Sequence, residues 1–230
     1  MKMKNTENNT LSREELQART RYLSEFMMPE RFDALCRALD NRTDYIAVMT
    51  ENMFHPQNAS AVVRHCEAFG VQNIHTVENL CRFNPNINIV RGTDKWIDIN
   101  RHASTAEALH SLKAQGYRIV ATTPHRESCT PETLDVTRGR FAIVLGTEKQ
   151  GISDEVMGAA DEFLRIPMCG LVESLNVSAS AAILIYILSQ RMRHEVSDWR
   201  LSADRHAELL YRWCRESVRD AEGLLERFGK

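Results

Sequence analysis

Residue types that can bind or polarise a ligand gather in four segments of this 230-residue chain. Residues 146–151 place one carboxylate, Glu148, between two glycines, and glycine lets a ligand approach the backbone closely. Residues 168–178 combine glycine, serine, glutamate and asparagine, and residues 122–124 read Thr-Thr-Pro. The fourth segment, residues 58–64, sets Arg64 in a run of small and apolar residues, where a charge needs a partner. Such groups could hold a small charged molecule and stabilise charge that develops on it.

Each segment also has a simpler structural interpretation. Residues 146–151 fit a tight turn with a solvated glutamate, and Ser174 fits a helix cap before an apolar helix. Arg64 fits a structural ion pair. At about 3.6 residues per turn, Asn58 and Arg64 share no helix face unless Asn58 lies on the loop before the helix. The segments therefore argue for function only in combination.

Short apolar runs alternate with helical patterns between about residues 45 and 193, as in strand–helix–strand crossovers. Residues 45–49 are almost continuously apolar, which is typical of a strand buried on both faces. Further strands are predicted at residues 74–77, 96–99, 117–122, 141–145 and 163–167, and helices at residues 58–69, 104–115, 154–160 and 174–192. We therefore expect an α/β fold with a mostly parallel sheet and helices on both faces. Ligands of such sheets bind at the carboxyl ends of the strands, where three of the four segments lie.

Helical patterns flank this region at both ends. A capping box at Ser12 predicts a helix to about Met28, Pro29 suits the first turn of a second helix, and a last helix is predicted from Ser202 to Phe228. The expected organisation is an N-terminal helical extension at 1–43, the α/β domain at 44–193 and a C-terminal helical extension at 194–230.

Composition excludes some classes of protein. The formal net charge is −2, the pI is about 6.5, and 43% of the residues are hydrophobic. Disorder over most of the chain is excluded. The charge balance argues against a highly basic nucleic-acid coat protein but does not exclude a local basic face.

Cysteine spacing and the lack of long apolar runs bear on metal, membrane and compartment. No two of the six cysteines lie closer than 15 residues, so we expect no zinc site. The longest apolar run, residues 181–188, is too short to span a bilayer, and residues 1–10 lack the apolar stretch of a signal peptide. We expect a cytoplasmic protein with no membrane and no metal.

Three of the segments, taken in order, resemble the signature motifs of a known family. Residues 58–64 with Gly70, residues 146–151, and residues 166–170 with 174–178 are similar to the motifs of the SpoU/TrmH family of RNA ribose 2′-O-methyltransferases. The resemblance implies a deep C-terminal trefoil knot (the SPOUT fold), S-adenosylmethionine as cofactor, and a homodimer with its active site at the subunit interface. The short terminal extensions most resemble the branch that acts on guanosine in tRNA.

The resemblance also assigns roles to particular residues. It implies a catalytic set of Arg64, Asn58, Glu148, Ser174 and Asn176. It implies that cofactor contacts come from Thr122, Gly146, Glu148, Ile166 and Leu175.

The implied reaction moves a methyl group from the sulfonium of S-adenosylmethionine to a ribose 2′-OH, by analogy that of guanosine 18 in the tRNA D-loop. Arg64 would assist deprotonation of that hydroxyl, either as a base or as a fixed cation, and a guanidinium normally only donates hydrogen bonds. Two alternatives stay open: the same chemistry on rRNA, and a catalytically silent RNA-binding protein with this fold.

Two further features allow two interpretations each. The apolar helix at residues 177–188 fits either a dimer interface or burial within one chain. The arginines of the two ends could bind RNA phosphates or form solvated helix faces; they include Arg13, Arg19, Arg200, Arg205, Arg212 and Arg215.

Overall fold

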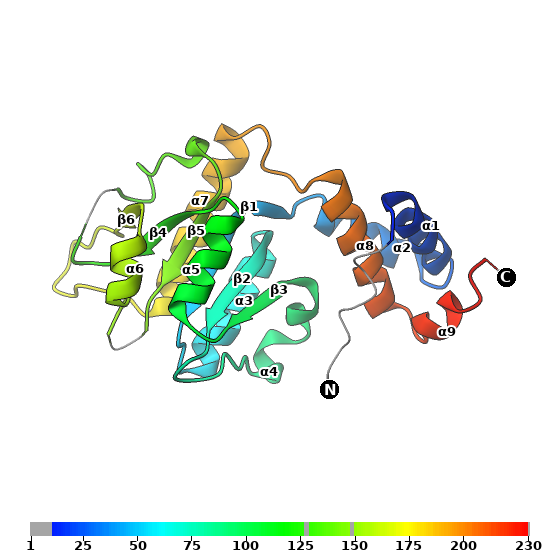
Figure 1. Cartoon of the computed structure of the whole chain (residues 1–230), viewed down its shortest axis with the longest axis horizontal. Coiled ribbons are helices and arrows are strands. Elements are labelled where there is room, and N and C mark those ends of the chain that lie inside the picture. The colour runs from blue at the N-terminus through cyan, green and yellow to red at the C-terminus, as the bar shows by residue number, and fades with distance from the viewer. Residues whose placement is uncertain (1–10, 127–128, 148–149, 230) are drawn as a thin grey trace. The chain divides into compact units, whose positions relative to one another are not determined.

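The computed structural model describes residues 11–126, 129–147 and 150–229. These form two units (Figure 1). One runs from Thr43 to Trp199; the other combines the residues before Thr43 with those from Arg200 onward.

The larger unit is built on a parallel sheet of six strands, in the order β3-β2-β1-β5-β4-β6. The predicted parallel α/β fold is therefore confirmed. The strands are β1 (Thr43–Glu51), β2 (Val71–Val77), β3 (Asp98–His102), β4 (Arg118–Thr122), β5 (Phe141–Leu145) and β6 (Glu162–Leu164).

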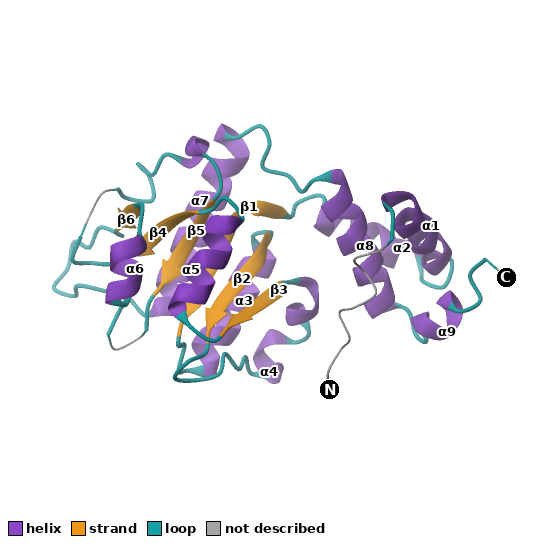
Figure 2. Cartoon of the chain, viewed as in Figure 1, coloured by secondary structure: helices purple, strands orange, loops and turns teal. Residues whose placement is uncertain are grey.

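Helices cover both faces of the sheet (Figure 2), because successive residues of a strand point to opposite sides. Ile46 and Val48 of β1 join one core cluster, with α3 (Pro56–Ala68) and α7 (Val177–Glu195). Ala47 and Met49 join the other, with α5 (Thr105–Ala114) and α6 (Asp154–Ala159). Burial on both faces explains why residues 45–49 are nearly all apolar.

Several element boundaries differ from the predictions. The strand expected at 163–167 ends at Leu164, and the residues up to Asn176 form a loop. The polar stretch before β3 holds two short elements that were not predicted, α4 (Ile87–Val90) and the 3₁₀ turn η1 (Thr93–Trp96). A second 3₁₀ turn, η2, spans Val136–Arg138.

The smaller unit consists of helices from both ends of the chain. It contains α1 (Arg13–Ser24), α2 (Pro29–Leu39), α8 (Ala203–Ser217) and α9 (Ala221–Leu225). The predicted capping box is present, with the Ser12 hydroxyl accepting from the Glu15 N–H at 3.2 Å. Trp213 of α8 is buried, and the Arg42 guanidinium lies 5.2 Å from its ring centroid.

The single last helix predicted from Ser202 to Phe228 is wrong. The chain leaves helical geometry at Val218, and Asp220 adopts a left-handed conformation with φ 55° before α9 begins. Aspartate tolerates this conformation better than most residues, and periodicity does not reveal such a break.

Candidate functional site

Three of the segments identified in the sequence leave neighbouring strands at the same edge of the sheet. Residues 122–124 follow β4, residues 146–151 follow β5, and the loop from Arg165 follows β6. The strand order places β5, β4 and β6 side by side and parallel, so their carboxyl ends meet. β1, which leads to α3, is the other neighbour of β5. Such an edge is where open α/β sheets bind ligands.

The loop after β5 folds back tightly on itself. The backbones of Thr147 and Gly151 form two reciprocal hydrogen bonds, of 2.8 and 3.1 Å. A Cβ on Gly146 would lie 2.1 Å from the carbonyl carbon of Gly151, so only glycine fits there. Gly151 itself has φ 72°, a conformation that favours glycine. Glu148, the predicted catalytic residue of this loop, lies outside the described residues.

The loop after β6 exposes apolar side chains. Leu171 is fully exposed and Val172 is 61% exposed, whereas Leu175 is 37% exposed. Ile166, at the start of the loop, packs against the core beneath it. Exposed apolar side chains beside the carboxyl ends of strands suit an apolar ligand surface or a protein partner.

The polar residues of this loop lie at the start of α7. Asn176, not Ser174, caps the helix: its side-chain oxygen accepts from the Ser178 N–H at 2.8 Å and the Ser178 hydroxyl at 2.6 Å. Helix α7 therefore begins three residues later than predicted. Ser174 is exposed in the loop before it.

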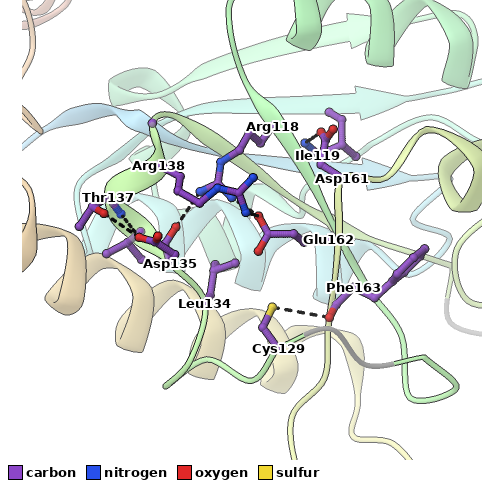
Figure 3. Close-up of polar contacts among 12 residues, drawn as sticks. Arg118, Ile119, Cys129, Leu134, Asp135, Thr137, Arg138, Asp161, Glu162 and Phe163 are labelled. Atoms are coloured by element: carbon purple, nitrogen blue, oxygen red, sulfur yellow. Dashed lines mark hydrogen bonds and ion pairs between the residues drawn. The ribbon is translucent and has the colours of Figure 1, made fainter.

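A polar network fixes β6 beside β4 (Figure 3). Arg118 of β4 forms an ion pair with Glu162 of β6 and donates to the Asp135 carbonyl at 2.8 Å. The Asp161 carboxylate accepts from the Ile119 N–H at 2.7 Å. On the other side of β6, Cys129 pairs with Leu164 by a parallel bridge. The start of the Arg165 loop is therefore held firmly to the sheet.

Thr122 has a structural hydrogen bond at the end of β4. Its hydroxyl donates to the Val144 carbonyl of β5 at 2.8 Å, and the side chain is half-buried. This bond ties the ends of the two strands together and leaves the Thr122 backbone at the edge of the sheet.

Helix α3 presents the first motif on two different sides. Asn58 lies in its first turn and is buried, whereas Arg64 is exposed. The Arg64 Nη1 donates to the Ile89 carbonyl of α4 at 3.2 Å. Because six residues turn a helix by about 240°, Asn58 and Arg64 face apart. The partner found for Arg64 is a backbone carbonyl, rather than the acidic group of an ion pair.

His65, the residue after Arg64, connects the first and third motifs. Burial and the neighbouring Arg64 charge lower the pKa of His65, and a hydrogen bond with the Ser178 backbone opposes them. Farther along the same two helices, the rings of Phe69 and Tyr186 lie with their centroids 5.4 Å apart. The packing of α3 on α7 thus places residue 64 near the start of α7.

One buried carboxylate at this edge was missed by the sequence analysis. Glu51 ends β1, is 3% exposed, and bonds to Thr105 and Ser153. The only sign of it in the sequence is an acidic residue at the end of an apolar run, and an exposed strand end gives the same pattern.

No helix in the part of the chain that the structure describes is long and apolar enough to cross a membrane. No group of three or more His, Cys, Asp or Glu side chains in residues 11–126, 129–147 and 150–229 is arranged to hold a metal ion.

Comparisons with known proteins agree with the motifs. Residues 45–186 match the SpoU rRNA Methylase family. The chain is 34% identical over 198 residues to the tRNA (guanosine(18)-2′-O)-methyltransferase of Borreliella burgdorferi, covering 86% of this chain and 90% of that protein.

Two solved structures show the same fold. The A. aeolicus TrmH/SpoU tRNA modifying enzyme matches with a TM-score of 0.73 at 30% identity, over 83% of this chain and 98% of that one. The SpoU methyltransferase AviRb from Streptomyces viridochromogenes, solved in complex with AdoMet, matches with a TM-score of 0.58 at 22% identity, over 69% of this chain and 62% of that one. The family model covers more than half of the chain, and its match contains all three motifs. The chain therefore belongs to the SpoU rRNA Methylase family.

Proposed function

We propose that this protein transfers a methyl group from S-adenosylmethionine to the ribose 2′-OH of a guanosine in tRNA, at position 18 of the D-loop. The observation that carries the proposal is the convergence of the loops after β4, β5 and β6 in a chain that is similar over most of its length to enzymes of that name. Arg64 lies on α3, the helix that follows the neighbouring strand β1.

The loops fit S-adenosylmethionine, because they offer backbone groups and apolar contact together. The crowded backbone at Gly146 leaves no room for a side chain. Ile166 and Leu175 supply apolar surface, and Thr122 keeps its backbone at the edge. When bound, the cofactor supplies a methyl group that its sulfonium already activates.

Arg64 is suited to electrostatic assistance. Its guanidinium is exposed and donates one hydrogen bond to the Ile89 carbonyl, so further N–H groups can donate to a ligand. A fixed cation beside the ribose stabilises the alkoxide that forms as the 2′-OH loses its proton. Ser174 and Asn176 shape the loop opposite, and Asn58 holds the first turn of α3 in the interior.

A second copy of the chain completes the site in this proposal. Leu171 and Val172 of the third loop and Tyr186 of α7 are apolar and exposed, as expected of residues that a partner covers. One face of α7 is buried within the chain, through Ala181, Leu184 and Leu188. The apolar sequence of this helix would therefore serve both the core of one chain and the dimer interface. A trefoil knot that encloses these loops is part of the same proposal, as is a cytoplasmic location.

In this proposal, the segment near Arg64 offers more positive charge to RNA than the terminal helices do. Arg13 pairs with Asp204 at 3.4 Å and Arg205 with Glu208 at 2.9 Å. By contrast, the side chains of Arg82, Arg91 and Lys95 are exposed and form no ion pair or hydrogen bond with any other described residue. The segment that carries them packs on α3 through α4 and η1.

The two alternative functions predict different substrates. Incubation with radiolabelled S-adenosylmethionine and separate pools of unmodified tRNA and rRNA, followed by mapping of the methylated ribose, distinguishes all three. We expect label in tRNA at guanosine 18. Label in rRNA alone would establish the rRNA alternative, and no label in either pool would favour a silent RNA-binding protein.

A further inference from the structure

A buried carboxylate lies where β1, α5 and α6 meet. The Glu51 Oε1 accepts from the hydroxyls of Thr105, at 2.7 Å, and Ser153, at 2.8 Å. The Glu51 Oε2 accepts from the backbone N–H of Ser153 at 2.9 Å. We infer that Glu51 is a positioning residue for the two ends of the cofactor loop, Gly146–Thr147 and Gly151. This inference rests on the proposed function and assigns a further residue to it.

Glu51 is connected to the loop through Ser153, which lies close to Gly151 in the chain. Ser153 caps α6 through Val156 and stands two residues after Gly151. Gly151 is bonded to Thr147 in both directions, and its carbonyl carbon lies so close to Gly146 that a Cβ there would be 2.1 Å away. Moving Ser153 would therefore move the backbone of Gly146, Thr147 and Gly151.

Sheet register explains why a residue of β1 can hold a loop that follows β5. Thr50 lies opposite Leu145, so Glu51 is beside the point where the loop leaves the sheet. Thr105, the first residue of α5, holds the carboxylate from the other side. The loop is thus fixed by a strand that carries no residue of the second or third motif.

A role in packing alone would not explain the residue type. Burying a carboxylate costs free energy unless hydrogen bonds compensate, and an apolar residue would fill the space without that cost. Within the described residues, the hydrogen bonds to the Glu51 carboxylate all come from Thr105 and Ser153. A carboxylate only accepts, so it suits a site where a backbone N–H must be held in place.

The experiment compares three variants, Glu51→Ala, Glu51→Gln and Thr105→Val. In Glu51→Gln the amide oxygen can accept from the Ser153 N–H while the amide nitrogen donates to the two hydroxyls, so the geometry is preserved. Thr105→Val is the matched control, because it removes one bond to the same carboxylate but leaves both bonds to Ser153. The measurements are binding of S-adenosylmethionine by calorimetry without RNA, the KM for tRNA, and the Tm of each variant.

We expect Glu51→Ala to weaken S-adenosylmethionine binding about tenfold or more while the KM for tRNA stays the same, since a displaced loop misplaces the ligand. Glu51→Gln should restore binding to within about threefold of the unmodified protein, and Thr105→Val should change it by less than about twofold. If Glu51 had a purely structural role, Glu51→Ala and Thr105→Val would both have a lower Tm, but their affinities for S-adenosylmethionine would not differ.

Two results would overturn the inference alone: unchanged cofactor binding in folded Glu51→Ala, or an equal loss in Thr105→Val. If Glu51→Ala does not fold, Glu51→Asp takes its place, because its shorter side chain cannot reach both partners. The unmodified protein separates this test from that of the proposed function. If it neither binds S-adenosylmethionine nor methylates RNA, both proposals fail.

Discussion

At the scale of single residues, the site combines an exposed cation with a rigid backbone turn. Arg64 projects from α3 with its guanidinium held by the Ile89 carbonyl. Position 146 accepts only glycine, because the backbone of Gly151 occupies the space that a side chain would need. Neither residue contributes much to the hydrophobic core, so their identities reflect chemistry and backbone geometry.

The role of Arg64 is tested by substitution to alanine and to lysine. We expect Arg64→Ala to lower the kcat of methyl transfer about 100-fold or more, because the developing alkoxide loses its cation. Arg64→Lys should be intermediate, since it keeps the charge but not the planar fork. Binding of S-adenosylmethionine and the Tm should not change, because the side chain is exposed. Near-normal turnover of Arg64→Ala would remove this residue from the mechanism.

At the scale of elements, the packing of strands and short helices decides which side chains meet. β2 and β3 bring His75 and His102 into a parallel stack, with His75 Nδ1 3.0 Å from His102 Nε2. Glu107 of α5 faces the other side of His102, 3.6 Å from its Nδ1. A hydrogen bond between the two rings requires one N–H and one lone pair, so the bond is lost when both rings are protonated.

This pair predicts a pH dependence of stability. Burial, and then the neighbouring His102, lower the pKa of His75 to about 4 from 6.5. Because the unfolded chain binds this proton more readily, the contribution is complete above pH 6.5 and is lost as the pH falls toward about 4. The loss is about 3 kcal/mol. Urea unfolding across this range should show a smaller pH slope for His75→Gln than for the unmodified protein, and equal slopes would contradict the prediction.

A second prediction at this scale concerns the segment that packs on α3. If Arg91 and Lys95 contact RNA phosphates, their double substitution to alanine should raise the KM for tRNA and reduce the salt slope of RNA binding by about 2. Binding of S-adenosylmethionine should stay unchanged. Lys113→Ala, an exposed lysine near the end of α5, serves as the control. If the double variant had the same salt slope as Lys113→Ala, Arg91 and Lys95 would not contact RNA, and the terminal arginines would be the candidates instead.

At the scale of the whole molecule, the proposal requires two copies of the chain. If Arg64 of one copy serves the loops of the other, two inactive variants should complement each other. Arg64→Ala lacks the cation, and Gly146→Val lacks the cofactor loop geometry.

Mixing these two variants under conditions that exchange subunits should restore activity. Half of the dimers are then mixed, and each mixed dimer has one intact site, so about a quarter of the normal activity returns. A site contained within one chain predicts no recovery. Each variant alone, carried through the same exchange, is the control.

The sequence by itself determined the class of fold, the position of most strands and helices, and the three motifs that identify the family. These properties are local: burial on both faces makes residues 45–49 apolar, and glycine is needed wherever the backbone turns tightly. It also predicted which loops lie at the carboxyl edge, because parallel strands share one direction. Local pattern did not reveal the cap at Asn176 or the break after α8, since each depends on one residue's conformation.

Only the tertiary structure decided which distant side chains meet. The order β3-β2-β1-β5-β4-β6 is not the order of the sequence, and it is this order that sets Glu51 against Ser153, 102 residues away. The same packing brings His65 to Ser178 and joins helices from both ends of the chain in one unit. Contacts across such separations depend on how whole elements pack, and hydrophobic periodicity carries no information on the choice of partner.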